Sequence, residues 1–428
     1  MIVICELICK EFSHEKVNSG FIYALRLAYP DEPLRFYADS SHISAIKAIL
    51  AHDEIIIENI EYIPIKFKDS SSLSGAVRYY FLLKKIFNEL NNLKVDKIFF
   101  LSYSPLIIYL IKKLKLHVEY LHLKFTIVLH GDFENIASDK GEAHDPDLSI
   151  PNLNNAISSS YLEKIRKIKL ADYPRKFKIG VRLINSKLNR LKINPSKWLS
   201  TKAMLLFNHS NDFKYVVLSP HIIKNAAKYI DVDKLNINLV MFPTNFVKAT
   251  PQPKNDYVRF GIFGYGDALM LHNIGHELSK KNINKKYEIR IIGMGVANFP
   301  NITFPSQGKP LTRIDMEKYA EDIDVFLIMY NKKKYRLGCS GTIIESLSNV
   351  KPILHFDNDC INTFNTPDVP IGICCNNISE YTDKMADIIE NYEEYIPDFE
   401  LYRNNIMKLR DKYAIKNSSV QLRNSFTW

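Results

Sequence analysis

Short apolar runs alternate with amphipathic stretches along most of this 428-residue chain, and this alternation constrains the fold more than any other feature. Short apolar runs are typical of buried strands, and apolar residues spaced three and four apart are typical of helices. Strands that alternate with helices predict an α/β protein with parallel sheets. The expected strands are residues 2–7, 34–37, 54–57, 97–101, 126–129, 215–218, 258–263, 289–292, 302–304, 325–329 and 352–356, and the expected helices are residues 20–27, 44–50, 77–90, 105–114, 161–170, 267–281, 313–321 and 341–348.

The series is interrupted at residues 242–256, FPTNFVKATPQPKND, which contain three prolines and show no periodicity. Such a segment is typical of an interdomain linker. A chain of 428 residues also exceeds the ~100–200 residues of an ordinary domain. We therefore predict two Rossmann-like, doubly wound domains, residues 1–245 and 246–400, that face each other across a cleft. A helical segment, residues 401–428, is expected to cross back to the first domain.

The cysteines and the apolar runs indicate in which cellular compartment the protein works. The six cysteines show no CxxC or zinc-like spacing, and a chain of this length does not depend on disulfides. The start, MIVICELICKEF, lacks the basic and small-residue parts of a signal peptide. No apolar run reaches the ~18 residues of a membrane span. We expect a cytoplasmic protein.

The formal charge of +10 is compatible with nucleic acid, an anionic membrane or a phosphorylated substrate as partner. The lysines are scattered among acids, however, and the 24 Tyr and 24 Phe mostly occupy apolar positions of strands and helices, so no nucleic-acid partner is expected. Residues 104–116, SPLIIYLIKKLKL, fit an interfacial helix, and equally a buried helix with lysines at its C-terminus. Peripheral membrane contact through this helix or through Lys84 and Lys85 is therefore expected if the acceptor is lipid-linked.

The sequence YRLGCSGTIIESLSNVKPILHF, residues 335–356, carries the most chemistry. A helix N-terminus after a strand offers unpaired N–H groups and a partial positive charge, so the turn before this helix can accept phosphate oxygens. A carboxylate one turn inside the helix can accept hydrogen bonds from sugar or ribose hydroxyls. The predicted donor-site residues of this segment are Tyr335, Arg336, Ser340, Gly341, Thr342 and Glu345.

An alternative without a ligand exists for the same helix. Thr342 and Glu345 have the spacing of a capping box, in which the two side chains satisfy backbone donors of the helix itself. A cap does not require the Tyr335–Arg336 pair or the Ser340–Gly341 turn just upstream.

Together with the preceding strand VFLIMY and the following NVKPIL, the segment resembles the donor-sugar motif of bacterial GT-B glycosyltransferases that build capsules, lipopolysaccharide and exopolysaccharide. The likeness covers residues 258–360 well and the first half weakly. It implies a nucleotide-sugar donor in domain 246–400, an acceptor in domain 1–245, and no metal or other cofactor. The chain differs from glycosyltransferase family 4, which has a second glutamate eight residues before the first, where Leu337 stands here.

Two glycine turns follow strands of the second domain. They carry Gly264 and Tyr265 after residues 258–263, and Gly293 after residues 289–292. Turn glycines are the ordinary explanation, and the complete GxGxxG fingerprint is absent. The resemblance implies that both turns face the donor.

The first domain has its own polar strand end, His130-Gly-Asp132-Phe-Glu134. A carboxylate or histidine there can act as the base that deprotonates an acceptor hydroxyl. We take Asp132 or Glu134 as the base and His130 as the contact to the donor sugar, or the reverse; a simple capped turn is the alternative. Ser19 and Gly20 are expected to contact the acceptor, or to begin a helix with Ser19 as cap.

These features predict a glycosyltransferase that moves a sugar from a nucleotide-diphospho-sugar to a hydroxyl of a glycan or lipid-linked saccharide, in bacterial surface polysaccharide synthesis. A GT-B epimerase, a polymer-phosphate transferase and a non-catalytic nucleotide-sugar binding protein are the alternatives. Asp357-Asn358-Asp359 has the form of a metal-binding DxD pair, but it lies late in the chain, and no metal site is predicted.

Overall fold

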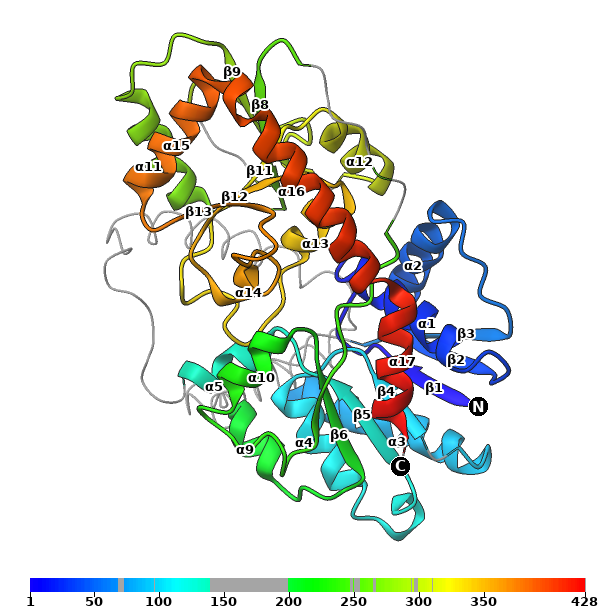
Figure 1. Ribbon diagram of the computed structural model, residues 1–428. Coiled ribbons are helices and arrows are strands. Elements are labelled where there is room, and N and C mark those ends of the chain that lie inside the picture. Colours follow the sequence, from blue (N-terminus) through cyan, green and yellow to red (C-terminus); the bar gives the residue numbers. More distant parts are fainter. Residues whose placement is uncertain are drawn as a thin grey trace, which may run out of the picture.

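The computed structural model of this chain describes residues 1–67, 73–95, 97–138, 199–246, 249, 255–264, 267–293, 295, 299–309 and 311–427. Two parallel sheets form two lobes, as expected (Figure 1). The N-lobe sheet has the order β3-β2-β1-β4-β5-β6-β7 and the C-lobe sheet the order β10-β9-β8-β11-β12-β13. Both orders reverse beside the first strand of the lobe, which is the doubly wound arrangement.

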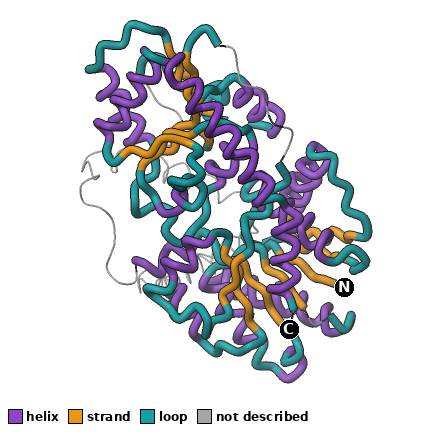
Figure 2. Tube along the Cα trace, viewed as in Figure 1, coloured by secondary structure: helices purple, strands orange, loops and turns teal. Residues whose placement is uncertain are grey.

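In the N-lobe the strands are β1 (Ile2–Cys5), β2 (Leu34–Asp39), β3 (Ile60–Ile65), β4 (Lys97–Phe100), β5 (Lys124–Val128), β6 (Phe213–Val217) and β7 (Ile237–Leu239). The helices are α1 (Glu15–Ala28), α2 (Ser40–His52), α3 (Leu73–Asn92), α4 (Pro105–Leu114), η1 (Val118–Tyr120), η2 (Asp132–Glu134), α5 (Asn135–Ser138), α9 (Thr201–Leu206) and α10 (Pro220–Ala226). Figure 2 shows helices on both faces of this sheet.

In the C-lobe the strands are β8 (Val258–Phe263), β9 (Tyr287–Ile292), β10 (Ile302–Thr303), β11 (Val325–Ile328), β12 (Ile353–Phe356) and β13 (Gly372–Cys375). The helices are α11 (Ala268–Ser279), α12 (Arg313–Glu321), α13 (Gly341–Ser348), α14 (Asp359–Asn362), α15 (Ile378–Glu390) and α16 (Tyr392–Lys412), and α17 (Ile415–Phe426) follows. The inner strands, such as β1, β11 and β12, are apolar runs buried on both faces, as parallel sheets require, whereas the edge strands β3, β7 and β10 are only partly buried.

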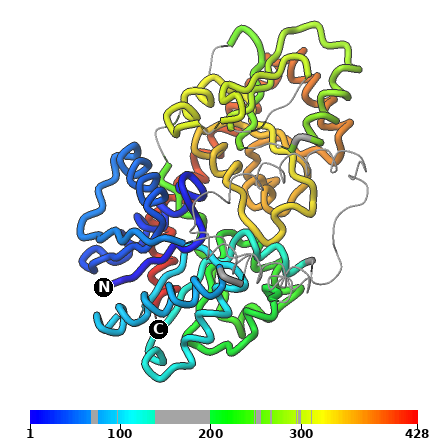
Figure 3. Tube along the Cα trace, turned by 180° about the vertical axis from the view of Figure 1, so that it is seen from behind, coloured from blue at the N-terminus to red at the C-terminus, as the bar shows by residue number. Residues whose placement is uncertain are grey.

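The last two helices join the lobes. Helix α16 runs along the C-lobe, and α17 then packs against α1 of the N-lobe, so the chain crosses back as predicted (Figures 1 and 3). Arg423 donates to the carbonyl of Ala28 at 2.9 Å, and Phe426 packs on Tyr29. The boundary drawn at residue 400 falls inside α16, and the crossing follows Lys412.

Several expected elements differ from the structure. Residues 54–57 are not a strand: the chain turns at Glu54, which has φ 56°, residues 55–57 are irregular, and the strand, β3, begins at Ile60. The expected start of a helix at Ser19 is wrong, since α1 begins at Glu15. Helix 161–170 lies outside the described residues. Helices 105–114, 313–321 and 341–348 and strand 258–263 are confirmed to the residue.

The sequence allowed the helix of residues 105–114 to be either an interfacial helix or a buried one, and the structure shows it buried. Ile107, Ile108 and Ile111 are in the core, and even Lys112 is 1% exposed, with its ammonium group donating to the carbonyl of Leu205 at 2.6 Å. No helix among the described residues is long and apolar enough to cross a membrane.

Candidate active site

A cavity of about 470 Å³ lies between the lobes, and we call it the interlobe cavity. Ligands of doubly wound sheets bind beyond the carboxyl ends of the strands where the strand order reverses. Loops after β1 and β5 contribute from the N-lobe, and loops after β8 and β9 with the starts of α12 and α13 contribute from the C-lobe. Of the predicted residues, this cavity brings together His130, Glu134, Gly264, Gly293, Tyr335, Gly341 and Glu345.

The start of α13 differs from the capping box. Its N-cap is Ser340, whose hydroxyl accepts from the N–H of Thr342 at 3.2 Å and lies 2.8 Å from the hydroxyl of Tyr330. A methyl group added at Gly341 would meet no atom within 4 Å, so the helix N-terminus opens onto free space. The amide end of α13 is therefore accessible from the cavity.

Glu345 faces two cations instead of its own backbone. Its carboxylate accepts from Lys16 of α1 at 3.0 Å and, with both oxygens, from Arg313 of α12 at 2.8 Å. Burial by itself raises the pKa of this carboxyl, but Arg313 and Lys16 outweigh burial and lower the pKa to about 2. Glu345 is thus ionised and can accept further hydrogen bonds from a ligand.

Arg313 and Lys16 are functional candidates that the sequence reading missed. Arg313 is the first residue of α12, where it also pairs with Glu317 at 2.7 Å. Lys16 also donates to the hydroxyl of Ser348 at 3.1 Å. Because a buried carboxylate requires a partner cation, the sequence can predict that some Lys or Arg pairs with Glu345. Only the packing of the lobes identifies which one.

A smaller pocket of about 240 Å³, the donor-side pocket, lies on the C-lobe between the ends of β8 and β11. Gly264, Tyr330, Lys334, Tyr335 and Thr342 contribute to it. It adjoins the interlobe cavity through Gly264 and Tyr335, which line both. Tyr265 lies outside the described residues.

The N-lobe holds the loop before α13 in place. Glu134 accepts from the N–H of Leu337 at 2.8 Å, and His221 of α10 donates to the carbonyls of Tyr335 and Gly338 at 2.9 and 3.0 Å. Asn225 donates to the carbonyl of Arg336 at 3.1 Å. These bonds fix residues 335–338, including Tyr335 at φ 59°. Glu134 is therefore placed to position this loop.

Arg336 is not among the residues that line the interlobe cavity or the donor-side pocket. Burial raises the pKa of Glu134, and the nearby charge of Arg336 opposes this rise. The contact of Arg336 to a diphosphate stays a prediction.

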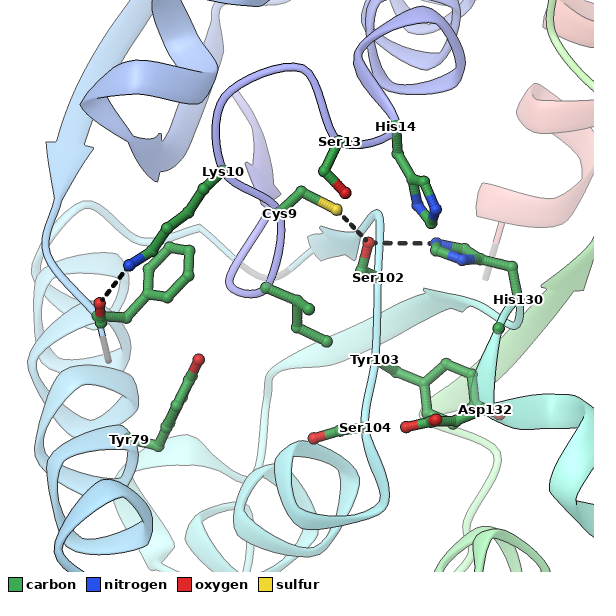
Figure 4. Close-up of a pocket in the computed structure, with 13 residues that line it drawn as sticks. Cys9, Lys10, Ser13, His14, Tyr79, Ser102, Tyr103, Ser104, His130 and Asp132 are labelled. Atoms are coloured by element: carbon green, nitrogen blue, oxygen red, sulfur yellow. Dashed lines mark hydrogen bonds between the residues drawn. The ribbon is translucent and has the colours of Figure 1, made fainter. Parts of the chain in front are cut away.

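A third pocket, of about 490 Å³, lies on the N-lobe between the ends of β1 and β4 (Figure 4). We call it the acceptor-side pocket because the sequence leads us to expect the acceptor in this lobe. Its lining residues include Cys9, Lys10, His14, Tyr79, Ser102, Tyr103, Ser104, His130 and Asp132. His14 and His130 line both this pocket and the interlobe cavity, so the two spaces meet at these rings.

His130 is a neutral ring held in one orientation. Its Nε2 lies 2.9 Å from the carbonyl of Leu101 and 3.1 Å from the hydroxyl of Ser102, which itself donates to Glu6 at 2.5 Å. Burial and then the neighbouring His14 lower its pKa to about 4. The carbonyl contact makes Nε2 the protonated nitrogen and leaves Nδ1 as an acceptor.

Asp132 is a half-buried carboxylate in the wall of the acceptor-side pocket. Burial raises its pKa above the ordinary value of 3.8. Within the described part of the chain no ion pair neutralises it, in contrast to Glu345. A carboxylate with a raised pKa beside a pocket has the properties of a general base.

His14 is the other candidate base, and the sequence reading missed it. It stands at the N-terminus of α1 with φ 55°, and its ring centroid lies 4.7 Å from that of His130. Burial lowers its pKa, although the nearby Glu6 opposes this effect. Its place in the loop between the first strand and the first helix of a doubly wound sheet is a signal that was available in the sequence.

Ser19 and Gly20 lie in the middle of α1, both buried. A methyl group at Gly20 would lie 2.1 Å from the carbonyl oxygen of Pro243, so the glycine allows close packing of helix and chain. Neither residue lines the interlobe cavity or the acceptor-side pocket. The described residues contain no group of three or more His, Cys, Asp or Glu that could hold a metal ion.

Neither a protein-family model nor a curated protein matches this sequence. Solved structures do match the fold. HepE of Anabaena in complex with UDP-glucose gives a TM-score of 0.58 at 10% identity over 99% of both chains. The lipopolysaccharide outer core galactosyltransferase WaaB gives 0.56 at 11% identity over 99% of this chain and 98% of that one. A glycosyltransferase from Rickettsia africae gives 0.55 at 11% identity over 99% and 97%. The chain thus has the two-lobed α/β fold of these proteins along nearly its whole length.

Proposed function

We propose that the protein is a glycosyltransferase that moves a sugar from a nucleotide-diphospho-sugar to a hydroxyl of a glycan or lipid-linked saccharide. One observation carries the proposal: the strand-order reversals of both sheets open onto one interlobe cavity, in a fold shared with a protein that holds UDP-glucose. The likeness to WaaB favours bacterial surface polysaccharide synthesis as the setting.

The donor occupies the C-lobe side of the interlobe cavity in this proposal. The diphosphate lies against the amide end of α13 at Gly341 and against the turns at Gly264 and Gly293, where no side chain obstructs it. Lys16 and Arg313 line the cavity from either lobe, but Glu345 and Glu317 already balance their charge, so the proposal assigns the diphosphate to the backbone N–H groups of α13 and of the two turns, without a metal. Glu345 accepts hydrogen bonds from ribose hydroxyls.

The acceptor occupies the acceptor-side pocket, with its hydroxyl near His130 and Asp132. Asp132 takes the proton of that hydroxyl, the oxygen bonds to the anomeric carbon, and the bond from that carbon to the diphosphate breaks. The nucleoside diphosphate leaves with the electron pair. His130 accepts a hydrogen bond from the donor sugar through Nδ1, and His14 is the alternative base.

Thermal shift with a panel of nucleotide sugars tests the donor half of the proposal. A ligand at a hundredfold excess over its dissociation constant stabilises the protein by about 2.7 kcal/mol. The Glu345→Gln protein should lose most of the shift, and the Asp132→Asn protein should keep it. If no nucleotide sugar of the panel produces a thermal shift, the proposal is contradicted.

Product analysis separates the alternatives. A transferase releases nucleoside diphosphate only when an acceptor is present, and Asp132→Asn lowers the rate. An epimerase changes the nucleotide sugar without acceptor, and a polymer-phosphate transferase releases a nucleoside monophosphate. A binding protein shows the shift and no product.

A further inference from the structure

The outer face of α3 carries large apolar side chains in contact with solvent. Val77 is 49% exposed and Phe81 is 62% exposed, and the two residues lie one helical turn apart. The inner face is ordinary core, with Tyr79, Leu83 and Phe87 buried. Figure 3 shows this helix on the outside of the N-lobe.

A second group of exposed apolar side chains lies beside the C-terminal half of α3. Tyr120 of η1 packs on Phe87 with ring centroids 5.5 Å apart and donates to Asn88, so η1 lies beside α3. The turn around η1 exposes three further apolar side chains, Leu116 (59%), Val118 (82%) and Leu121 (55%). We call these residues, with Val77 and Phe81, the α3–η1 face.

Basic residues flank this face. Arg78 and Lys85 of α3 are exposed, Lys84 is half-buried, and Lys113 is exposed at the end of α4. Two acidic residues belong to the same elements: Glu89 of α3 is already paired with Arg35 at 2.8 Å, and Glu119 of η1 is exposed. The four basic residues outnumber these two acids. Apolar side chains surrounded by lysine and arginine are complementary to an anionic bilayer, in which acyl chains lie beneath phosphates.

We propose that the α3–η1 face docks on the surface of an anionic lipid bilayer. Phe81, Val77 and Val118 enter the boundary between headgroups and acyl chains, and Arg78 and Lys85 contact lipid phosphates. The site differs from the helix of residues 105–114, whose apolar side chains are already used in the core.

Docking in this orientation brings the acceptor-side pocket close to the bilayer. Tyr79, on the inner face of α3, lines that pocket and donates to the carbonyl of Leu7 at 2.8 Å. One helix therefore separates the pocket from the lipid surface. This consequence rests on the proposed function and identifies the acceptor as a lipid-linked saccharide; the docking itself does not depend on it.

Co-sedimentation of the full chain with vesicles tests the docking. Vesicles of phosphatidylcholine alone are compared with vesicles that also contain phosphatidylglycerol. We expect binding to the anionic vesicles that weakens as salt is raised. Phe81→Ser with Val77→Ser should reduce binding by roughly tenfold or more, and Arg78→Gln or Lys85→Gln by about fivefold each.

Matched controls lie on α17, which packs on the opposite face of the N-lobe sheet from α3. Val420, 60% exposed, is changed to Ser, and the exposed Lys416 to Gln, with no expected loss of vesicle binding. Circular dichroism and the donor-induced thermal shift confirm that each variant is folded, so a failed donor site and a failed docking face are told apart.

Three outcomes would overturn the proposal: no binding to anionic vesicles, equal loss in the control variants, or binding independent of lipid charge. A dimer that Phe81→Ser converts to a monomer, without vesicle binding, would assign the face to a second copy of the chain.

Discussion

Lys16 of α1 and Glu345 of α13 lie 3.0 Å apart across the interlobe cavity, and their contact ties the two lobes together at the proposed ribose site. The same carboxylate binds Arg313 from α12. A second tie, between His52 of α2 and Glu317 of α12 at 2.9 Å, extends the cluster along the boundary. The carboxylate proposed to bind the donor is thus also one that holds the lobes together.

Removing the lysine tests this double role. Lys16→Met leaves Glu345 paired with Arg313, so the C-lobe should stay folded while the tie between the lobes is lost. We expect a lower donor affinity and easier proteolysis of the segment between the lobes, with a modest change in melting temperature. Lys416→Met on α17 is the matched control. Unchanged affinity and proteolysis would show that the contact is incidental.

The acid dependence of stability should report on Glu345. Its folded pKa of about 2 lies below the ordinary value of 4.5, so its contribution is fully present above pH ~4.5 and is lost as the pH falls toward 2. The shift corresponds to roughly 3 kcal/mol. Urea unfolding of wild type and Glu345→Gln should therefore differ at pH 7 and converge near pH 2. A difference that is constant with pH contradicts the ion-pair assignment.

Glu134 and Asp132 should respond differently to amide replacement. Gln at 134 can still accept from the N–H of Leu337, so Glu134→Gln should keep the rate within severalfold, whereas Glu134→Ala leaves that N–H unsatisfied and raises the KM for the donor. Asp132→Asn removes the proposed base and should lower kcat by roughly 10²- to 10⁴-fold.

The pH–rate profile distinguishes the two candidate bases. With Asp132 as base, the rate falls on acidification at a pKa above 3.8, and Asp132→Asn abolishes this limb. If His14 is the base instead, His14→Gln abolishes the limb and Asp132→Asn does not. Full activity in both variants would exclude both residues.

Two glycines provide a matched pair of alanine substitutions. At Gly20 the added methyl group meets the carbonyl oxygen of Pro243, so Gly20→Ala should destabilise the protein by about 1–3 kcal/mol. At Gly341 the methyl meets nothing, so Gly341→Ala should leave stability unchanged while it lowers donor affinity at the start of α13. Thermal unfolding with and without nucleotide sugar measures both effects. Equal donor shifts in Gly341→Ala and wild type would remove this residue from the donor site.

The periodicity of the sequence determined the two-lobed α/β fold and the places where loops of chemical interest occur. Local spacing suffices for this, because strand and helix periods and the rule that ligands bind at strand ends are properties of short segments and of topology. The sequence pattern located helix α13 with Gly341 and Glu345, and it located the strand end that carries His130 and Asp132. The sequence pattern failed at residues 54–57, where apolar residues lie in an irregular segment after α2.

The partners of these groups depended on the tertiary structure. Glu345 pairs with Lys16, 329 residues away in sequence, and Glu134 anchors Leu337, 203 residues away. No local pattern encodes such contacts, because they arise when two separately folded sheets pack with their strand ends facing each other. The same packing decided that residues 105–114 are core while α3 buries one apolar face and leaves Val77 and Phe81 exposed on the other, since burial depends on what covers a helix as well as on its own sequence.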